Sequence, residues 1–239
     1  MISISHLTKI YPGAKKPAVN DLSLTIADGE IFGFIGHNGA GKSTTIKSIV
    51  GILDYEGGEI LINGINLKEK PLECKKTIAY IPDSPDIYEF MSGIEYLNFI
   101  CDIFDVDNIR NERIERYATL FEIKDVLADP IKTYSHGMKQ KLSIVAALCH
   151  EPKVLILDEP FVGLDPKASY QLKKIFKERC ANGMSIFFST HVLEVVEKLC
   201  DHVAIIKDGQ LVANGKVSEV KGDKSLESIF LELYEENKQ

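Results

Sequence analysis

A glycine-rich stretch that ends in Lys42 and Ser43 is the clearest candidate for chemistry in this sequence. Residues 36–43 read GHNGAGKS, the spacing of a phosphate-binding loop. Glycines let a backbone curl so that successive N–H groups point inward and bind an anion. The Lys42 ammonium would bridge phosphates and the Ser43 hydroxyl would bind Mg²⁺, so the stretch predicts a nucleoside-triphosphate site. The residues expected to contact the nucleotide are Gly36, His37, Asn38, Gly39, Ala40, Gly41, Lys42, Ser43 and Thr44.

Two adjacent carboxylates, Asp158 and Glu159, follow a run of four apolar residues at 154–157. Such a run predicts a parallel strand that is buried on both faces, with the acids delivered at its carboxyl end. In isolation, solvated acids capping a buried strand would explain the pattern equally well. Beside a phosphate-binding loop, Asp158 is expected to hold Mg²⁺ directly or through water, and Glu159 to orient or deprotonate an attacking water.

A single histidine, His191, ends another apolar run at 184–188. Lone histidines are more often structural than functional. If the two apolar runs form parallel strands, however, His191 would lie at the same sheet edge as the acids.

The elements that must position these residues follow from sequence periodicity. An apolar run at 31–35 leads into the glycine-rich loop, and residues compatible with a helix follow Gly41. Alternating patterns at 2–10 and 18–26, separated by turn residues, predict an antiparallel layer. Further strands are expected at 59–63, 77–81, 202–207 and 210–213.

Between about residues 91 and 150 the spacing of apolar residues becomes that of helices. A rigid loop with two prolines is expected at 82–86. Ser92 and Glu95 then fit a capping box, and 107–121 predicts a second amphipathic helix. Two more helices are expected, one ending near Cys180 and one beginning near Ser225. The sequence thus predicts a helical insertion within a chain of strands and helices.

Composition narrows the class of protein further. The chain has 239 residues, 45% apolar content and a net charge of −7, without a block of basic residues, so general affinity for nucleic acid is not expected. Five scattered cysteines without a C-x-x-C pair indicate free thiols in a reducing compartment. We see no secretory signal and no stretch of about 20 apolar residues that could span a membrane.

Residues 134–141 read YSHGMKQK and precede the acid-bearing strand by some 20 residues. With the motifs above, this stretch resembles the signature, usually LSGGQ, of nucleotide-binding subunits of ATP-binding cassette (ABC) transporters. The resemblance covers essentially the whole chain, and the loop with Asp83 and this signature are similar to those of bacterial export ATPases of the ABC-2 type. It implies a P-loop NTPase core of α/β class, with a mostly parallel sheet and flanking helices, an N-terminal antiparallel β layer and an inserted α-helical subdomain.

The resemblance also assigns roles to individual residues. Tyr11 matches the aromatic residue that stacks on adenine, while Lys42, Glu159 and His191 match the catalytic groups. Ser135, Gly137 and Asp165 match residues that contact the ATP bound by the opposite cassette. Ser43, Asp83 and Asp158 are the expected Mg²⁺ ligands. The domain division implied is a core of 1–90 and 151–213, a signature subdomain of 91–150 and a helical tail of 214–239.

As an activity, the resemblance implies ATP hydrolysis in a dimer of cassettes that closes around two ATP molecules. This would drive movement of a substrate, with export favoured, through a separate transmembrane permease. The chain would then be cytoplasmic, held on the inner face of the membrane by the permease.

Three residues depart from the family pattern. Asp83 replaces the usual Gln, and a carboxylate there would bind Mg²⁺ more strongly while adding negative charge near the γ-phosphate. His136 and Met138 replace a Gly and a Gln of the signature, which leaves open whether two composite sites hydrolyse ATP equally. The alternatives are a soluble ABC-type ATPase acting on nucleic acid or ribosomes, and a GTPase or small-molecule kinase. No Asn-Lys-x-Asp for guanine is present.

Overall fold

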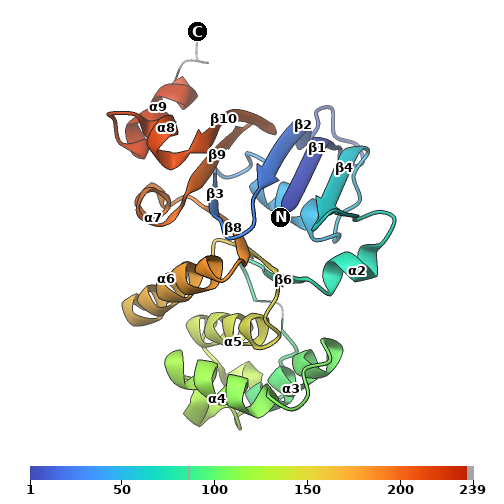
Figure 1. The fold of residues 1–239 in the computed structure, drawn as a ribbon, viewed down its shortest axis with the longest axis vertical. Helices are drawn as coiled ribbons and strands as arrows, with labels where there is room; N and C mark the ends of the chain where they lie inside the picture. The colour runs from blue at the N-terminus through green and yellow to red at the C-terminus, as the bar shows by residue number, and fades with distance from the viewer. Residues whose placement is uncertain (86, 236–239) are drawn as a thin grey trace.

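The computed structural model describes residues 1–85 and 87–235, and Figure 1 shows how their helices and strands are arranged. Asp86, which belongs to the loop expected at 82–86, lies outside the described residues. The same holds for 236–239, the end of the expected helical tail.

A six-stranded sheet runs through the centre of the molecule in the order β10-β9-β3-β8-β7-β6. Neighbouring strands are parallel except β10, which pairs antiparallel with β9. β3, β7 and β8 are buried along their whole length, as expected of strands covered on both faces. The strands are β3 (Ile31–Ile35), β6 (Ile78–Ile81), β7 (Val154–Asp158), β8 (Ser185–Thr190), β9 (His202–Lys207) and β10 (Gln210–Lys216).

A smaller antiparallel sheet, in the order β2-β1-β4-β5, covers one face of the central sheet together with helix α1. Its strands begin the chain, so the expected antiparallel layer is confirmed. Phe32 and Phe34 of the central sheet are buried on this face. The elements are β1 (Ile2–Lys9), β2 (Val19–Ile26), α1 (Lys42–Ile49), β4 (Gly57–Ile62) and β5 (Ile65–Asn66).

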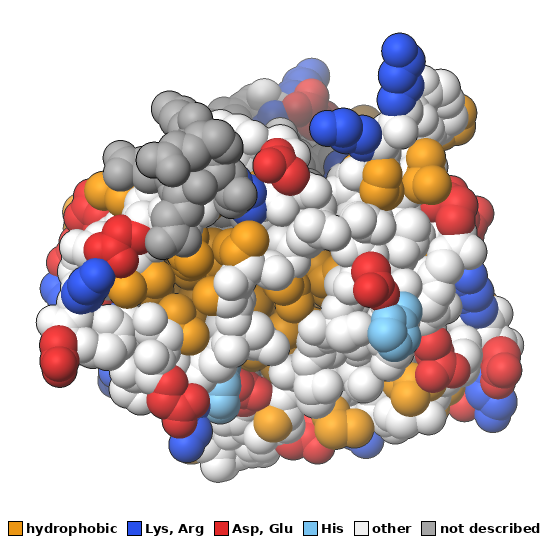
Figure 2. Space-filling view, turned by 90° about the horizontal axis from the view of Figure 1, so that it is seen from above, with side chains coloured by type: hydrophobic (Ala, Val, Ile, Leu, Met, Phe, Trp, Pro, Cys, Tyr) orange, Lys and Arg blue, Asp and Glu red, His pale blue; other side chains and the backbone are white. Residues whose placement is uncertain are grey.

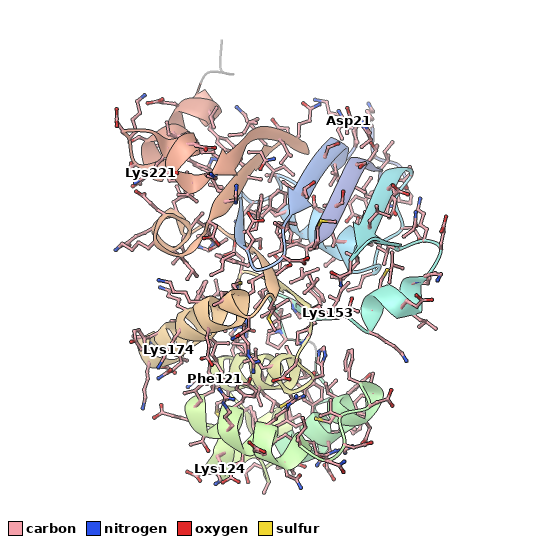
Figure 3. All side chains as sticks on the ribbon, in the orientation of Figure 1. Asp21, Phe121, Lys124, Lys153, Lys174 and Lys221 are labelled. Atoms are coloured by element: carbon pink, nitrogen blue, oxygen red, sulfur yellow. The ribbon has the colours of Figure 1, made fainter. Side chains whose placement is uncertain are left out.

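Helices cover the other face of the central sheet, where Ile31, Ile35 and Leu157 join a second core. Helices α3, α4 and α5 form the layer at the bottom of Figure 1, and Phe121, labelled in Figure 3, is buried within this core. The helices of this core are α3 (Gly93–Ile103), α4 (Arg110–Leu120), α5 (His136–Cys149), α6 (Pro166–Ala181), α7 (Leu193–Leu199) and α9 (Leu226–Glu235). The capping box of Ser92 and Glu95 is present at the start of α3.

Two element boundaries differ from the expected ones by three residues. α4 begins at Arg110 and not at 107, because residues 107–110 form a turn in which the Arg110 N–H donates to the Asp107 carbonyl (3.2 Å). β10 continues through Lys216, beyond the strand end expected at Ala213 and into the expected helical tail, because residues 214–216 still pair with β9.

Six short elements were not expected from the sequence: β5 (Ile65–Asn66), α2 (Pro71–Lys75), η1 (Lys124–Val126), η2 (Ile131–Thr133), α7 (Leu193–Leu199) and α8 (Val217–Lys221). None of the helices in residues 1–85 and 87–235 combines the length and the apolar character that crossing a membrane requires.

Candidate functional site

Four neighbouring parallel strands bring the predicted site residues to one edge of the central sheet. β3, β8, β7 and β6 lie side by side and are followed by residues 36–38, His191, Glu159 and Asp83, respectively. These residues line a single cavity of about 790 Å³. The carboxyl ends of parallel strands are where open α/β sheets bind ligands. Ser84, His136, Val162 and Phe230 complete the lining.

The glycines of the loop at 36–43 are required by its shape. A Cβ on Gly36 would lie 2.5 Å from the Ile206 carbonyl oxygen, so a side chain there would collide with the end of β9. Gly41, with φ of 109°, has a left-handed backbone conformation, and a Cβ there would lie 2.6 Å from the Ala18 carbonyl oxygen. The loop is thus packed against β9 and the β1–β2 connection, and α1 begins directly after it.

Lys42 is the first residue of α1 and is buried. Its Nζ donates to the carbonyl oxygens of Gly36 (2.7 Å) and His37 (3.3 Å), so the ammonium lies inside the curl of the loop. Burial lowers the pKa of Lys42, and the negative charges of Glu159 and Asp158 oppose this shift. The cation and the two acids are therefore parts of one electrostatic site.

Ser189 on the central strand β8 holds both acids of β7. Its hydroxyl donates to Asp158, and the Glu159 N–H donates to the Ser189 carbonyl (3.2 Å) and hydroxyl (3.1 Å) oxygens. Glu159 has a left-handed backbone with φ of 50°, uncommon for a residue with a side chain. No role for Ser189 was predicted from the sequence; the signal that could have found it is its place two residues before His191 at a strand end.

The Glu159 and His191 side chains meet at the cavity. His191 Nδ1 lies 3.0 Å from Glu159 Oε2, with the glutamate side chain 13% exposed and the histidine 60% exposed. A mostly buried carboxylate next to an accessible imidazole can receive, hold and return a proton at a water in the cavity.

Tyr11 lies beside the loop, as the sequence predicted for an aromatic group near the nucleotide. Its hydroxyl is 3.2 Å from the Thr44 Oγ1, and its ring is exposed. An exposed ring next to the start of α1 is accessible to a flat heteroaromatic group.

Ser135, Gly137 and Asp165 do not line the cavity in this chain. Ser135 caps α5 by accepting the Met138 N–H (3.2 Å). Asp165 caps α6 and pairs with Lys141 of α5 (2.5 Å). A Cβ on Gly137 would lie 2.7 Å from the Gly163 carbonyl oxygen, so the start of α5 packs tightly on the loop that follows Glu159.

The predicted metal ligands are all oxygen donors, which suits Mg²⁺. Ser43 is exposed at the start of α1, Asp158 is buried at the end of β7, and Asp83 is exposed on the cavity. In the part of the chain that the structure describes, no cluster of three or more His, Cys, Asp or Glu side chains could hold a metal ion by itself. The donor set therefore fits a cation that takes its other ligands from phosphate and water.

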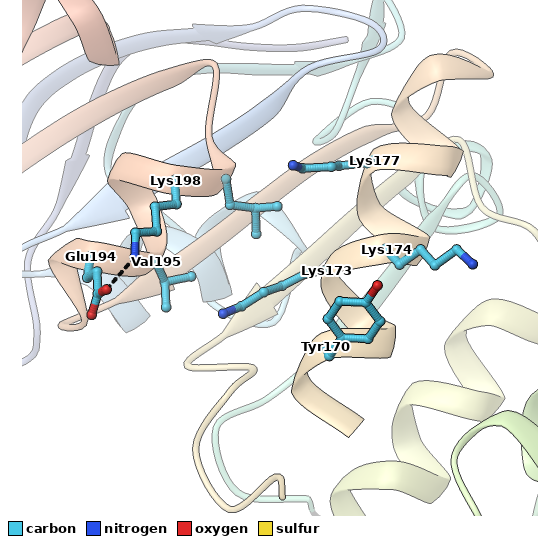
Figure 4. A pocket seen from close by; sticks show the side chains of 8 residues that line it. Tyr170, Lys173, Lys174, Lys177, Glu194, Val195 and Lys198 are labelled. Atoms are coloured by element: carbon cyan, nitrogen blue, oxygen red, sulfur yellow. Dashed lines mark hydrogen bonds and ion pairs between the residues drawn. The ribbon is translucent and has the colours of Figure 1, made fainter. Parts of the chain in front are cut away.

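A different cavity, of about 430 Å³, lies between α6 and α7 (Figure 4). Its walls include Lys173, Lys174, Lys177 and Lys198, the last paired with Glu194 (2.6 Å). None of the predicted site residues lines it, so we do not assign the nucleotide to this groove.

A phosphate-binding loop, an acid pair and a histidine at the carboxyl edge of a mostly parallel sheet define a P-loop nucleoside triphosphatase. The model of the ABC transporter family matches residues 19–162. One similar solved structure is described as the ATP-binding subunit of an ABC transporter. It has a TM-score of 0.93 and 33% identity and covers 98% of this chain and 99% of its own. Another, a dimeric post-hydrolysis state of the cassette MJ0796 bound to ADP and Pi, shares the fold, with a TM-score of 0.81 and 21% identity over 91% of this chain and 99% of its own.

Curated relatives agree with this class. The uncharacterized ABC transporter ATP-binding protein YhcH of Bacillus subtilis is 37% identical over 94% of this chain and 73% of its own length. The ABC-type transporter ATP-binding protein EcsA of the same organism is 35% identical over 99% of this chain and 98% of its own length. The linearmycin resistance ATP-binding protein LnrL, also from Bacillus subtilis, is 33% identical over 92% of this chain and 70% of its own length. The chain belongs to the ABC transporter family, as an ATP-binding subunit with ATPase activity.

Proposed function

We propose that this chain hydrolyses Mg²⁺-ATP in a pair of cassettes and thereby drives export of a substrate through a separate membrane permease. One observation supports the proposal above the others. The loop at 36–38, Asp83, Glu159 and His191 line the same cavity although they come from four different strands.

The chemistry follows from the positions of these groups. Glu159 orients a water and accepts its proton as the water attacks the γ-phosphate, and ADP and phosphate are the products. Lys42 and His191 stabilise the charge that develops on the γ-phosphate. Ser43, Asp158 and Asp83 would hold Mg²⁺, which when bound neutralises charge on the β- and γ-phosphates. Tyr11 stacks on the adenine.

A second cassette completes the site. Ser135 and Gly137 lie at the start of a 14-residue helix, α5, whose N–H groups and positive end suit a phosphate. We assign these two residues, with Asp165, to the ATP bound by the partner cassette, as the family resemblance implies. None of the three lines the cavity of its own chain, although His136, between Ser135 and Gly137, does. A related fold has been solved as a dimer bound to ADP and Pi, which supports this arrangement.

The permease is proposed to dock at the groove between the central sheet and the helical layer. This cavity of about 520 Å³ is lined mainly by apolar side chains, Tyr96, Ile100 and Phe104 among them. Beside it in the sequence and exposed to solvent are Tyr88 and the 80% exposed Phe90. Exposed aromatic groups of this kind mark protein contact sites. Contact with the permease would hold the chain at the cytoplasmic face of the membrane.

Export as the direction of transport is supported by the relatives. LnrL is named for resistance to linearmycin, and removal of a toxic compound from the cell is one way to resist it. The sequence resemblance to ABC-2 export ATPases agrees with that direction.

The test of the proposed activity is Glu159→Gln, which retains the shape of the side chain but removes its basicity. We expect ATP turnover to fall at least about a hundredfold, while ATP binding is retained. The matched control is Glu194→Gln, because Glu194 is an exposed carboxylate on α7 outside the cavity. Equal turnover in Glu159→Gln and the unmodified chain would remove Glu159 from the role of base.

A further inference from the structure

The C-terminal helix α9 contacts the phosphate-binding loop directly. The Tyr234 hydroxyl accepts the His37 N–H (3.2 Å) and donates to the Ile206 carbonyl (2.6 Å). The two rings meet edge to face, with centroids 4.0 Å apart. One side chain of α9 thus joins the second residue of the loop to the end of β9.

Phe230, one turn earlier on α9, extends this contact. Its ring lies 4.9 Å from that of His37 and 4.5 Å from that of Tyr234. Phe230 also lines the cavity that holds Glu159 and His191. The C-terminal helix therefore forms part of the wall of the proposed ATP site.

Both ends of α9 are fixed to the rest of the molecule. At its start, the Leu226 N–H donates to Glu197 Oε2 (3.3 Å), and the Leu226 side chain is fully buried. At its end, Lys207 Nζ donates to the carbonyl oxygens of Leu233 (3.0 Å) and Tyr234 (3.2 Å). A cation at the C-terminal end of a helix satisfies its last carbonyls and its dipole. The position of the Tyr234 hydroxyl is thus set by contacts at both helix ends.

The face that carries the C-terminal helices is shown in Figure 2, where hydrophobic side chains gather in the middle and charged ones lie around them. On α9, Leu231 is 51% exposed, whereas Phe230 is buried. Burial raises the pKa of the Tyr234 phenol, so it stays protonated and can donate to Ile206. Phe230 and Tyr234 of α9 therefore face the loop, whereas the Leu231 side chain faces solvent, so a substitution of Leu231 can serve as a control.

We propose that Tyr234, supported by Phe230 and Lys207, is a positioning residue that holds residues 36–38 of the loop ready for ATP. In this role the His37 N–H binds Tyr234 and not a phosphate, and the other N–H groups of the loop form the anion site. A loop that is already ordered loses less conformational entropy when the nucleotide binds. The inference rests on the proposed function only where it names ATP as the ligand.

The first test measures the loop without nucleotide. Tyr234→Phe removes the hydroxyl and keeps the ring, so the fold should persist. We expect amide hydrogen exchange in a peptide covering residues 32–41 to be about fivefold faster, as for loss of one net hydrogen bond. Lys207→Met removes the cation that holds the end of α9 and should shift exchange in the same direction. Leu231→Ala should leave exchange unchanged. Unchanged exchange in both Tyr234→Phe and Lys207→Met would overturn the inference, whether or not the chain binds ATP.

The second test separates positioning from chemistry. In Tyr234→Phe we expect the KM for ATP to rise about fivefold while kcat stays within about twofold, because the catalytic groups are untouched. Wild-type KM in Tyr234→Phe, or a fall in kcat alone, would contradict the positioning role. Failure of the unmodified chain to hydrolyse ATP would instead count against the proposed function, and the exchange experiment would still decide the role of Tyr234.

Discussion

At the scale of residues, the site depends on a few side chains that hold the reactive groups in place. Ser189 binds the Asp158 carboxylate and the Glu159 N–H, so the central strand fixes the position of both acids. Lys42 is held by two carbonyls of its own loop. Groups that are positioned before the substrate binds need no rearrangement during the reaction, which is where much of an enzyme's electrostatic stabilisation comes from.

Asp83 gives a sharp prediction at this scale. The carboxylate lines the cavity, and Asp83→Gln replaces this proposed Mg²⁺ ligand with a neutral amide, which binds Mg²⁺ less strongly. We expect the Mg²⁺ concentration for half-maximal ATPase activity to rise about tenfold. A magnesium titration of ATPase activity measures this, and Ser84→Ala, a neighbour on the same cavity, is the matched control. Identical titration curves for Asp83→Gln and the unmodified chain would show that Asp83 has no part in binding Mg²⁺.

Residue types and spacing were enough to predict the parts of the site that are close in sequence. The loop at 36–43 and the acid pair are local patterns, so the sequence alone locates them. The contact of Tyr234 with His37 joins residues 197 positions apart, and nothing in the local sequence around either residue indicates the other. Ser189 was missed for a related reason, since its hydrogen bonds are made to a neighbouring strand.

At the scale of elements, the start of α3 was predicted because its cap is a local sequence pattern, whereas α4 begins three residues later than expected. Ser92 and Glu95 form the expected capping box at the start of α3. Ser135, expected from the family resemblance as a contact for the ATP of the opposite cassette, also caps α5. Boundaries set by pairing with a distant strand were predicted less well. β10 continues to Lys216 because β9 offers it partners, which no local pattern specifies.

His150, at the end of α5, gives a pH prediction. Its ring stacks on Phe104 at 3.7 Å and joins α5 to the end of α3. Burial, with a smaller effect of Arg113, lowers the pKa of His150 from 6.5 to about 4. The pKa of His150 is lower in the folded chain than in the unfolded one. The contribution of the neutral ring to the free energy of unfolding is therefore fully present above pH 6.5 and is lost as the pH falls toward 4. This shift corresponds to about 3 kcal/mol at most.

The prediction is tested by urea unfolding between pH 7 and pH 4. We expect the free energy of unfolding to fall less steeply with decreasing pH in His150→Gln than in the unmodified chain. His6→Gln is the control, because His6 is exposed and lies on the antiparallel sheet. If His150→Gln showed the same pH dependence as the unmodified chain, His150 would not be a neutral histidine held by burial.

At the scale of the whole molecule, the architecture is two sheets and a helical layer that together leave one edge of the central sheet accessible. The fold class was implied by the family resemblance, while apolar runs, alternating patterns and a helical stretch predicted the buried strands, the antiparallel layer and the helical insertion. The order of strands was not predicted, since it depends on which faces pack against each other. That order places β8 between β3 and β7, and so brings His191 between the loop and the acids.

The central claim is that the ATP held by the loop of one cassette is closed by the start of α5 from another. The most direct measurement is the mass in solution of the Glu159→Gln chain with Mg²⁺-ATP, with a second substitution at Ser135. Both Ser135→Asn and Ser135→Asp retain a good helix cap, and only the second places a negative charge where the partner's phosphate would lie. We predict an ATP-dependent dimer for Glu159→Gln alone and with Ser135→Asn, and a monomer with Ser135→Asp. A dimer that forms equally with Ser135→Asp, or no ATP-dependent dimer of Glu159→Gln at all, would contradict the account.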